Sequence, residues 1–411
     1  MGRGPRSKTL APMSSQSPRG RRHPPAAPLL VLGTPYTESE FNAYCDGLLS
    51  ALGLGEGDIV GVELTRSSQR VYVEKLIERG FERGVEVVSL EDNDGDVATS
   101  KLNRVMDERG VVMQIQTLAS DNDQATVDNI DGSAWDRYSR GTADNSLRWS
   151  ISMWPSQDWA EVVYPDSPPE EAYRQLGQDL AHFARSDDQS WSAHMETLHR
   201  RADFLNDAEI DEITMTGPGT SLSMRVLPGA QFLPCDWKTK DGEFQVSCNV
   251  PTDEVFITPD PNTVEGVFQS TRPLVLGGHV FESVSGEFRE GKLIKIEGLS
   301  PDETDALRDH FISSDRGQEF IGELGLVDPR GRIGQNGNIF YNNIIDENAG
   351  SHIGLGYSYA ISSGENQGNQ SSGHNDIIFG GPEVDISGRS SSGKEVPIVK
   401  DGEWVADGDK I

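Results

Sequence analysis

The chain has 411 residues, 35% of them hydrophobic, and a formal net charge of -30 at pH 7. This length can form two domains or one large domain. The acidic balance excludes a general nucleic-acid binder, because a polyanion would be repelled, and no apolar run approaches the roughly 18 residues of a membrane-spanning helix.

Cysteine and lysine usage bears on the compartment. The three cysteines, Cys45, Cys235 and Cys248, are too few and too scattered for a disulfide framework, so a reducing, cytoplasmic location is expected. Lysine is sparse relative to arginine, and acidic residues are spread along the chain. Such a surface stays hydrated when salt screens charge repulsion, so a salt-rich origin is a hypothesis beside that of an ordinary acidic cytosolic protein.

Residues 1–35 form a basic tail that contains no acidic residue and is rich in proline and serine. This composition predicts disorder. The apolar stretch LLVLG is too short for a signal-peptide core, and no small-residue cleavage site follows it. A transit peptide has a similar composition, but a tail without a targeting role, or a misassigned start, is the preferred interpretation.

Residues 36–118 are predicted to form an α/β domain. Strand-like runs at 59–64, 85–90 and 111–117 alternate with segments of helical periodicity at 37–54, 67–84 and 98–110. This alternation indicates a parallel sheet covered by helices, in three layers. The glycines at 53, 55 and 57 leave a helix and enter a strand, the reverse of a dinucleotide-binding turn, and indicate a helix C-cap instead.

A larger α+β domain with antiparallel strands is predicted for residues 119–411. Residues 118–147 are polar and aperiodic, which places the boundary in this region. A strand at 149–155 and helices at 169–186 and 190–207 follow. From residue 209 onward, short alternating segments separated by turns indicate antiparallel strands. Ser300 to Glu303 form a predicted capping box that opens a helix through Ser314.

The run HMETLH places His194 and His199 on a predicted helix. A zinc-binding helix carries histidines at positions i and i+4. These two lie five positions apart, and therefore about 140° apart around the helix. They are predicted to be surface or packing histidines.

The stretch from Tyr341 to Gly381 concentrates carboxylates and imidazoles in a chain with only 8 histidines. Its candidates for a site with one or two divalent metal ions are Asp346, Glu347, His352, Tyr359, His374 and Asp376. His374 and Asp376 stand at i and i+2 of a predicted strand and so point the same way. His352 and Tyr359 lie two turns apart in a helix-like segment, with Glu347 in the loop before it. Asp346 is interpreted as a cap or supporting partner.

Five segments resemble, in their order and most of their spacing, the thermophilic-type metallo-aminopeptidases of the M29 family. The resemblance extends over almost the whole chain from Tyr36. The segments are PTDEVF (251–256), IGELGLV (321–327), FYNNIIDENAGSHIGLG (340–356), GHNDIIFGG (373–381) and KEVPIVKDGEW (394–404). The combination is specific, whereas no single segment would be.

The resemblance implies a ligand set for two divalent ions, in which Glu323 bridges them: Glu254, Glu323, Glu347, His352, His374 and Asp376. The implied ions are zinc, cobalt or manganese, with magnesium also possible. It further implies a homodimer that acts on peptides with a free N-terminus, with Tyr359 beside the metals to hold the developing oxyanion. A carboxylate near the attacking water could carry a proton to the leaving amine, and Glu254 is the candidate.

Two departures from the family pattern bear on substrate preference more than on the ligands. The segment between His352 and His374 is shorter and rich in small polar residues. The middle residue of the HxD motif is Asn375 rather than an apolar residue.

Two alternative functions stay open. A ring-cleaving dioxygenase on the same scaffold would hold one ferrous ion with two histidines and one carboxylate, whereas Glu254, Glu323 and Glu347 favour two metals. A metal-binding protein without catalysis would keep the ligands and show no turnover.

Overall fold

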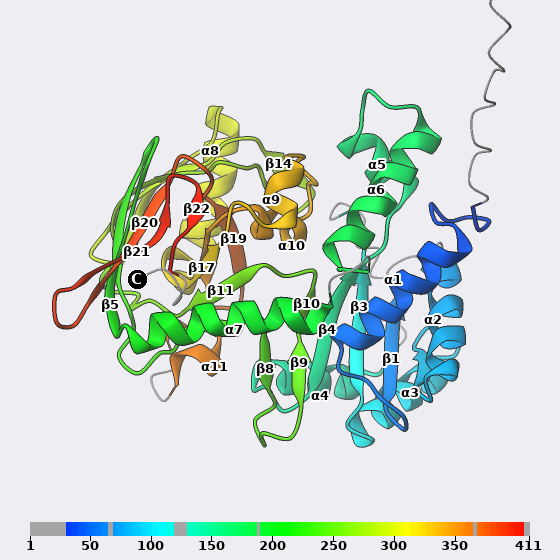
Figure 1. The fold of residues 1–411 in the computed structure, drawn as a ribbon. Helices are drawn as coiled ribbons and strands as arrows, with labels where there is room; N and C mark the ends of the chain where they lie inside the picture. Colours follow the sequence, from blue (N-terminus) through cyan, green and yellow to red (C-terminus); the bar gives the residue numbers. More distant parts are fainter. Residues whose placement is uncertain (1–29, 65–68, 119–129, 187–189, 365–367, 407–411) are drawn as a thin grey trace, which may run out of the picture.

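The computed structural model describes residues 30–64, 69–118, 130–186, 190–364 and 368–406. The N-terminal half is built on a five-stranded parallel sheet with the order β10-β4-β3-β1-β2 (Figure 1). Its strands are β1 (Ile59–Leu64), β2 (Glu86–Ser89), β3 (Val111–Gln116), β4 (Arg148–Met153) and β10 (Asn249–Val250).

Helices cover both faces of this sheet. The helices α1 (Glu38–Ala51) and α2 (Arg70–Glu82) pack on one face, and α3 (Gly95–Asp107) and α4 (Gly132–Ala143) pack on the other. Strand β1 is therefore buried along its whole length, as expected for a parallel strand with both faces covered. The predicted three-layer α/β arrangement is confirmed.

The region predicted to be aperiodic contains helix α4. Asp131 caps its first turn by accepting a hydrogen bond from the backbone N–H of Ser133, and Trp135 and Tyr138 pack against the core under the sheet. Because β4 and β10 join the first sheet, this sheet draws on residues from both sides of the predicted boundary at 118–119. The domain limits stay a prediction, and residues 1–29 of the predicted tail lie outside the described ranges.

Three helices follow β4: α5 (Gln157–Val163), α6 (Pro169–Phe183) and α7 (Trp191–Asp207). Figure 1 shows α7 running from the edge of the parallel sheet into the second half of the molecule. It contacts α1 as well as β7 and β11 of that half. Helices α5 and α6 enclose a separate apolar core with the segment around Phe340 and Ile345.

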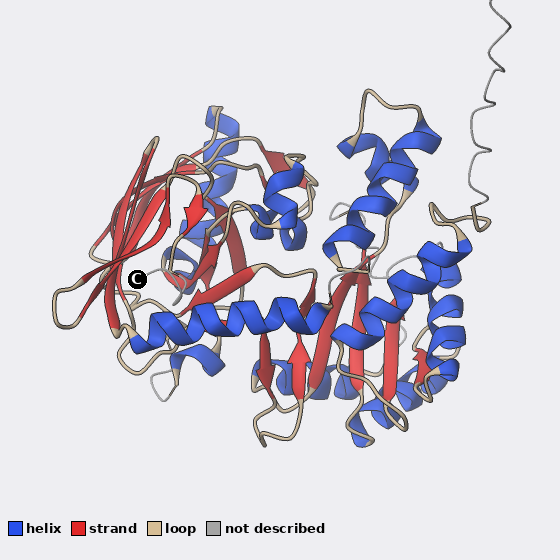
Figure 2. Cartoon of the chain, in the orientation of Figure 1, coloured by secondary structure: helices blue, strands red, loops and turns tan. Residues whose placement is uncertain are grey.

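The second half is dominated by antiparallel sheets, as predicted (Figure 2). A five-stranded sheet has the order β19 (His374–Ile378), β18 (His352–Gly356), β17 (Ile321–Val327), β11 (Glu254–Ile257) and β7 (Leu233–Pro234). An eight-stranded sheet has the order β16 (Lys292–Glu297), β15 (Ser285–Arg289), β12 (Glu265–Gln269), β6 (Thr220–Arg225), β5 (Ile210–Gly217), β20 (Asp385–Ser390), β21 (Glu395–Lys400) and β22 (Glu403–Trp404). Two-stranded pairs are β13 (Leu274–Leu276) with β14 (His279–Phe281) and β8 (Asp236–Lys238) with β9 (Gln245–Ser247).

Short helices connect these strands: α8 (Pro301–Arg308), α9 (Arg332–Asn336), α10 (Asn343–Asp346) and α11 (Ala360–Ser363). Ser300 caps α8 by accepting from the N–H of Glu303, which is one half of the predicted capping box, whereas the Glu303 carboxylate accepts from the N–H of Leu299 at 2.7 Å. The helix continues as a π-helical segment over Asp309–Ser314. Within the described ranges no helix combines the length and apolar character needed to cross a membrane.

Candidate metal centre

Four adjacent strands of the five-stranded sheet carry the candidate ligands. In the register, Glu254 of β11 is opposite Val327, and His352 of β18 is opposite Gly325 of β17. Gly354 lies between Glu323 on one neighbouring strand and Asp376 on the other. Directly opposed residues point to the same side of a sheet. The register therefore collects the side chains on one face: Glu254, Glu323, His352, His374 and Asp376.

The prediction of a helix-like segment from His352 onward is wrong. Residues 352–356 form strand β18, which pairs with β17 on one side and β19 on the other. Glycines at 354 and 356 disfavour a helix, and Ile353 and Leu355 are fully buried as a central strand requires. Tyr359 instead reaches the site from the residue before α11, with its ring centroid 5.2 Å from that of His374.

Two glycines make room for the imidazoles. A Cβ on Gly325 would lie 2.2 Å from the ring of His352, and a Cβ on Gly354 would lie 2.6 Å from the ring of His374. Real Cβ atoms essentially never come so close to another heavy atom. Each ring therefore occupies space beside a glycine of the neighbouring strand that a Cβ would otherwise fill.

The five side chains form two groups of three that share one member. His352 Nε2 lies 3.1 Å from Glu254 Oε2, and His374 Nε2 lies 2.9 Å from Glu323 Oε2 and 3.1 Å from Asp376 Oδ1. In the described part of the chain, ligand atoms within 4.8 Å of one another come from Glu254, Glu323 and His352, and from Glu323, His374 and Asp376. Glu323 belongs to both groups.

Backbone carbonyls orient both imidazoles. His352 Nδ1 lies 3.2 Å from the carbonyl oxygen of Glu347, and His374 Nδ1 lies 2.8 Å from that of Tyr357. A carbonyl can only accept a hydrogen bond, so each Nδ1 carries the proton. Each Nε2 is thereby directed at the carboxylates, the arrangement by which metal-binding histidines are held in one tautomer.

The buried charges shift one another's pKa values. Burial opposes the charged form of His352, but its contact with Glu254 outweighs burial and raises the pKa to about 10. Burial likewise opposes charge on His374, whose pKa is raised well above its usual value by Asp376 and Glu323. Burial raises the pKa of Glu323, and burial followed by the charges of Asp376 and Glu254 raises that of Glu347. The raised pKa values of Glu323 and Glu347 show that this site favours a bound proton or cation over an uncompensated buried carboxylate.

The donor set fits divalent cations. It combines three carboxylates with two imidazoles that can bind a metal in their neutral form, which suits zinc, cobalt or manganese. Glu254 Oε2 is buried and makes no hydrogen bond of acceptable geometry to any described residue, although it lies 3.1 Å from His352 Nε2. A buried carboxylate oxygen without such a partner has a lone pair available for a cation.

Glu347 lies beside the two groups and belongs to neither. Its Oε1 accepts long hydrogen bonds from Asn249 Nδ2 at 3.4 Å and from Asn348 Nδ2 at 3.5 Å. Nothing in the sequence pattern singled out these two asparagines, since asparagine is common in loops. The neighbouring Asp346 accepts from the N–H of Phe340 and pairs with Arg272, in keeping with its predicted supporting role.

The segment that carries Glu347 is attached to the N-terminal half. Trp159 Nε1 donates to the carbonyl of Phe340 at 2.6 Å, and Asn342 Nδ2 donates to the carbonyl of Thr117 at 2.9 Å. Asn249 of β10 also donates to Glu347, so a strand of the parallel sheet contacts a candidate site residue directly. The position of Glu347 therefore depends on both halves.

The two histidines of α7 stay out of the ligand groups. His194 Nε2 lies 3.1 Å from Asp253 Oδ1, which also pairs with Arg185 at 2.9 Å, and His199 Nε2 lies 2.6 Å from Asp236 Oδ1. Since Asp253 immediately precedes Glu254, the first pair anchors the start of β11. Both histidines have the packing or surface role that their spacing predicts.

Asn375 does not face the ligands. It is opposite Leu355 in the register, on the other side of β19 from His374 and Asp376. There its Nδ2 lies 3.3 Å from His310 Nε2 and 3.4 Å from Gln318 Oε1. A polar environment behind the strand thus accounts for this departure from the family pattern.

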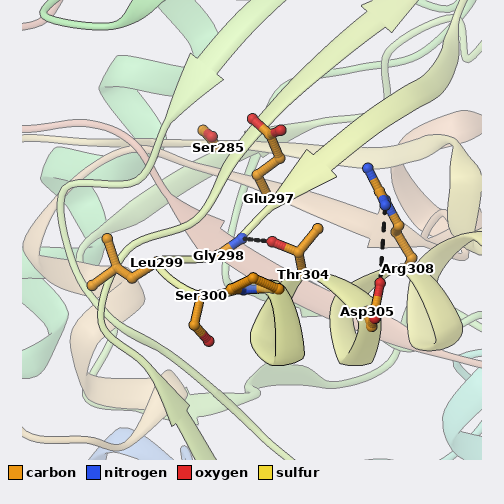
Figure 3. Close-up of a pocket in the computed structure, with 9 residues that line it drawn as sticks. Ser285, Glu297, Gly298, Leu299, Ser300, Thr304, Asp305 and Arg308 are labelled. Atoms are coloured by element: carbon orange, nitrogen blue, oxygen red, sulfur yellow. Dashed lines mark hydrogen bonds and ion pairs between the residues drawn. The ribbon is translucent and has the colours of Figure 1, made fainter.

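A separate surface hollow of about 450 Å³ lies between β16 and the start of α8 (Figure 3). Two pairs lie within its lining: Thr304 Oγ1 accepts from the N–H of Gly298, and Arg308 lies near Asp305. It shares no residue with the ligand groups, and we assign it no role in their chemistry.

Comparison with known proteins agrees with this geometry. Residues 112–404 match the model of the thermophilic metalloprotease (M29) family. Aminopeptidase T of Thermus aquaticus is 33% identical over 270 residues, covering 62% of this chain and 65% of that protein, so the match spans slightly under two thirds of the relative. Aminopeptidase AmpS of Bacillus subtilis is 29% identical over 289 residues, covering 67% of this chain and 70% of that protein.

The fold is also found in a solved structure. Wild-type AmpT from Thermus thermophilus superposes with a TM-score of 0.77 at 24% identity, covering 90% of this chain and 99% of that one. The family match extends over most of the chain and includes every candidate ligand. The chain belongs to the thermophilic metalloprotease family M29.

Proposed function

We propose that the protein is a metal-dependent aminopeptidase that removes N-terminal residues from peptides. The observation that carries this proposal is Glu323, which is shared by two ligand groups on one buried face of the sheet. Relatives named aminopeptidase T and AmpS support the same reaction class. Glu254, Glu323 and His352 would hold one ion, and Glu323, His374 and Asp376 the other.

When bound, a pair of divalent ions would activate a water molecule and polarise the scissile carbonyl. The side chains around them orient the substrate and move protons. Burial raises the pKa of the Tyr359 phenol well above its usual value, so the hydroxyl stays protonated at neutral pH. It can donate a hydrogen bond to the oxyanion that develops on the substrate.

Two carboxylates are candidates for moving the proton from water to the leaving amine. Glu254 was the sequence-based candidate, but it lies within a ligand group and contacts His352 at 3.1 Å. Glu347 lies outside both groups, and its pKa is raised by burial and then by the charges of Asp376 and Glu254. We therefore propose Glu347 for proton transfer, and its predicted role as a ligand stays the alternative.

One experiment tests the proposal. The purified protein is stripped of metal with a chelator and reloaded with zinc, cobalt, manganese or magnesium, and hydrolysis of aminoacyl p-nitroanilides is measured beside metal content. We expect about two ions per chain and metal-dependent release of the N-terminal residue. His352→Ala should abolish hydrolysis, whereas the matched control His199→Ala, at a histidine outside the ligand groups, should retain it.

The same measurements separate the other candidates. One iron per chain without peptide hydrolysis would support a dioxygenase. Two bound ions without turnover on any aminoacyl substrate would support a binding protein. The homodimer and the cytoplasmic location remain part of this proposal, and light scattering of the metal-loaded protein tests the first.

A further inference from the structure

An exposed aromatic side chain stands at the edge of the ligand groups. In the described ranges the two most exposed aromatic residues are Phe81, at 84%, and Tyr357, at 36%. Phe81 lies on α2, far along the chain from the candidate ligands, whereas Tyr357 directly follows β18. The Tyr357 ring centroid lies 4.9 Å from that of His374 and 5.5 Å from that of Tyr359.

The backbone holds Tyr357 in this position. Its N–H donates to the carbonyl of Gly373 at 3.0 Å, and its carbonyl accepts from His374 Nδ1 at 2.8 Å. A Cβ at position 322 would lie 2.4 Å from the backbone carbonyl oxygen of Tyr357, so only glycine permits this close approach. An exposed ring on a fixed backbone is prearranged to pack against a ligand without loss of much conformational freedom.

Tyr357 is the exposed end of a row of aromatic rings. Tyr359 contacts Phe256 at a centroid distance of 5.7 Å, and Phe256 contacts Trp237 at 5.9 Å. Phe256 and Trp237 are buried, and Leu233 and Ile361 pack against the same cluster. The row borders the site on the side of His374, and it consists of aromatic side chains without a carboxylate or an amine. The exposed ring of Tyr357 therefore continues a buried aromatic cluster to the surface beside a group of carboxylates.

We propose that Tyr357 is a specificity-determining residue that contacts an apolar or aromatic substrate side chain next to the scissile bond. This inference rests on the proposed function. Covering an aromatic ring with an apolar side chain removes both surfaces from water, which favours large apolar residues over alanine. A cationic side chain could also lie over the ring, but the uncharged row behind it favours an apolar one.

The test compares the metal-loaded wild type with Tyr357→Ala, Tyr357→Phe and the exposed-aromatic control Phe81→Ala. Substrates are the p-nitroanilides of leucine, phenylalanine, alanine and arginine, followed by leucyl dipeptides in which the second residue is alanine or phenylalanine. We expect Tyr357→Ala to lower kcat/KM for large apolar side chains about 10-fold and for alanine less than about 2-fold. Tyr357→Phe and Phe81→Ala should retain the wild-type preference and metal content. An effect within the p-nitroanilides means that the ring contacts the N-terminal residue, and an effect within the leucyl dipeptides means that it contacts the second residue.

Binding of leucine hydroxamate and alanine hydroxamate, measured by calorimetry on the same variants, tests the contact without turnover. If Tyr357→Ala binds the leucine compound selectively more weakly, the role of Tyr357 is supported. Failure to cleave any tested substrate would be a separate result, and it would refute the aminopeptidase assignment. Equal losses for all compounds, a loss confined to arginine, or a loss of bound metal would each overturn the role given to Tyr357.

Discussion

Gly325 lies directly across from His352 on the neighbouring strand, and a Cβ on Gly325 would come within 2.2 Å of the imidazole. The ring is almost completely buried, so it cannot move aside into solvent. The choice of glycine on β17 therefore determines where a proposed metal ligand on β18 can lie.

Gly325→Ala should displace His352 and weaken metal binding at the group of Glu254, Glu323 and His352. Forcing an extra methyl group into a packed site also costs about 1–3 kcal/mol of folding stability. Metal content by mass spectrometry and the unfolding free energy of the metal-free protein check the two effects separately. Gly132→Ala is the control, because nothing lies within 4 Å of its added Cβ, and it should change neither quantity by much. Full metal content in Gly325→Ala would contradict the proposed position of the ligand.

Glu347→Gln should retain close to two ions per chain and lose turnover about 100-fold or more, because the amide cannot accept the proton of the attacking water. Glu323→Gln should instead lose metal, because Glu323 belongs to both ligand groups. Metal analysis and kcat on the same preparations distinguish the two variants. Loss of one ion in Glu347→Gln would return Glu347 to the ligand set that the family resemblance implies.

Metal binding to the stripped protein should release protons. The pKa of His352 is raised to about 10, and that of His374 is also raised, so both imidazoles carry an extra proton at neutral pH. A cation requires neutral imidazole at Nε2, so binding must displace these protons. Calorimetric titration at pH 7.5 in buffers of different ionisation enthalpy should give a release of about two protons per chain, one from each imidazole. No dependence on the buffer would contradict the protonation of the metal-free site.

The same shift predicts how the stability of the metal-free protein depends on pH. A histidine whose folded pKa is raised stabilises the protein fully below its unfolded pKa, and this stabilisation disappears as pH rises through the folded pKa. For His352 the window runs from its ordinary value of 6.5 to about 10. Denaturant unfolding of the metal-free protein should show falling stability over this range, whereas the metal-loaded protein should lack this dependence on His352.

Much of the N-terminal fold is predictable because its signals are local. The run IVGVEL is apolar apart from the buried Glu63, which suits a parallel strand covered on both faces, and it forms β1 within the predicted limits. Helix α4 was missed because its sequence is mostly polar, and it is ordered by the cap at Asp131 and the packing of Trp135 and Tyr138. Strand β18 was misassigned because its glycines and buried side chains have meaning only between two neighbouring strands.

The candidate site was predictable in part. Local density in the sequence pointed to His352, His374 and Asp376, whereas Glu254 and Glu323 came from the family resemblance, since no periodicity links residues about 30 to 120 positions apart. The roles of Asn249 and Gly325 arise from contacts across the sheets and could not be derived from spacing. The structure brings five of the six predicted ligands into shared groups, and metal binding itself stays a prediction.

Tyr359→Phe should lower kcat about 100-fold while leaving KM and metal content nearly unchanged. The phenol ring packs against Phe256 and His374 at centroid distances of 5.7 and 5.2 Å, and phenylalanine preserves this packing. What is lost is the hydroxyl that is proposed to hydrogen-bond the oxyanion, an interaction stronger in the transition state than in the bound substrate. Such a loss appears in kcat, whereas removal of a ground-state contact would raise KM. Steady-state kinetics on leucine p-nitroanilide make this distinction, and the variant's unfolding temperature controls for damage to the fold. An unchanged kcat would remove Tyr359 from the mechanism and leave oxyanion stabilisation to other groups at the site.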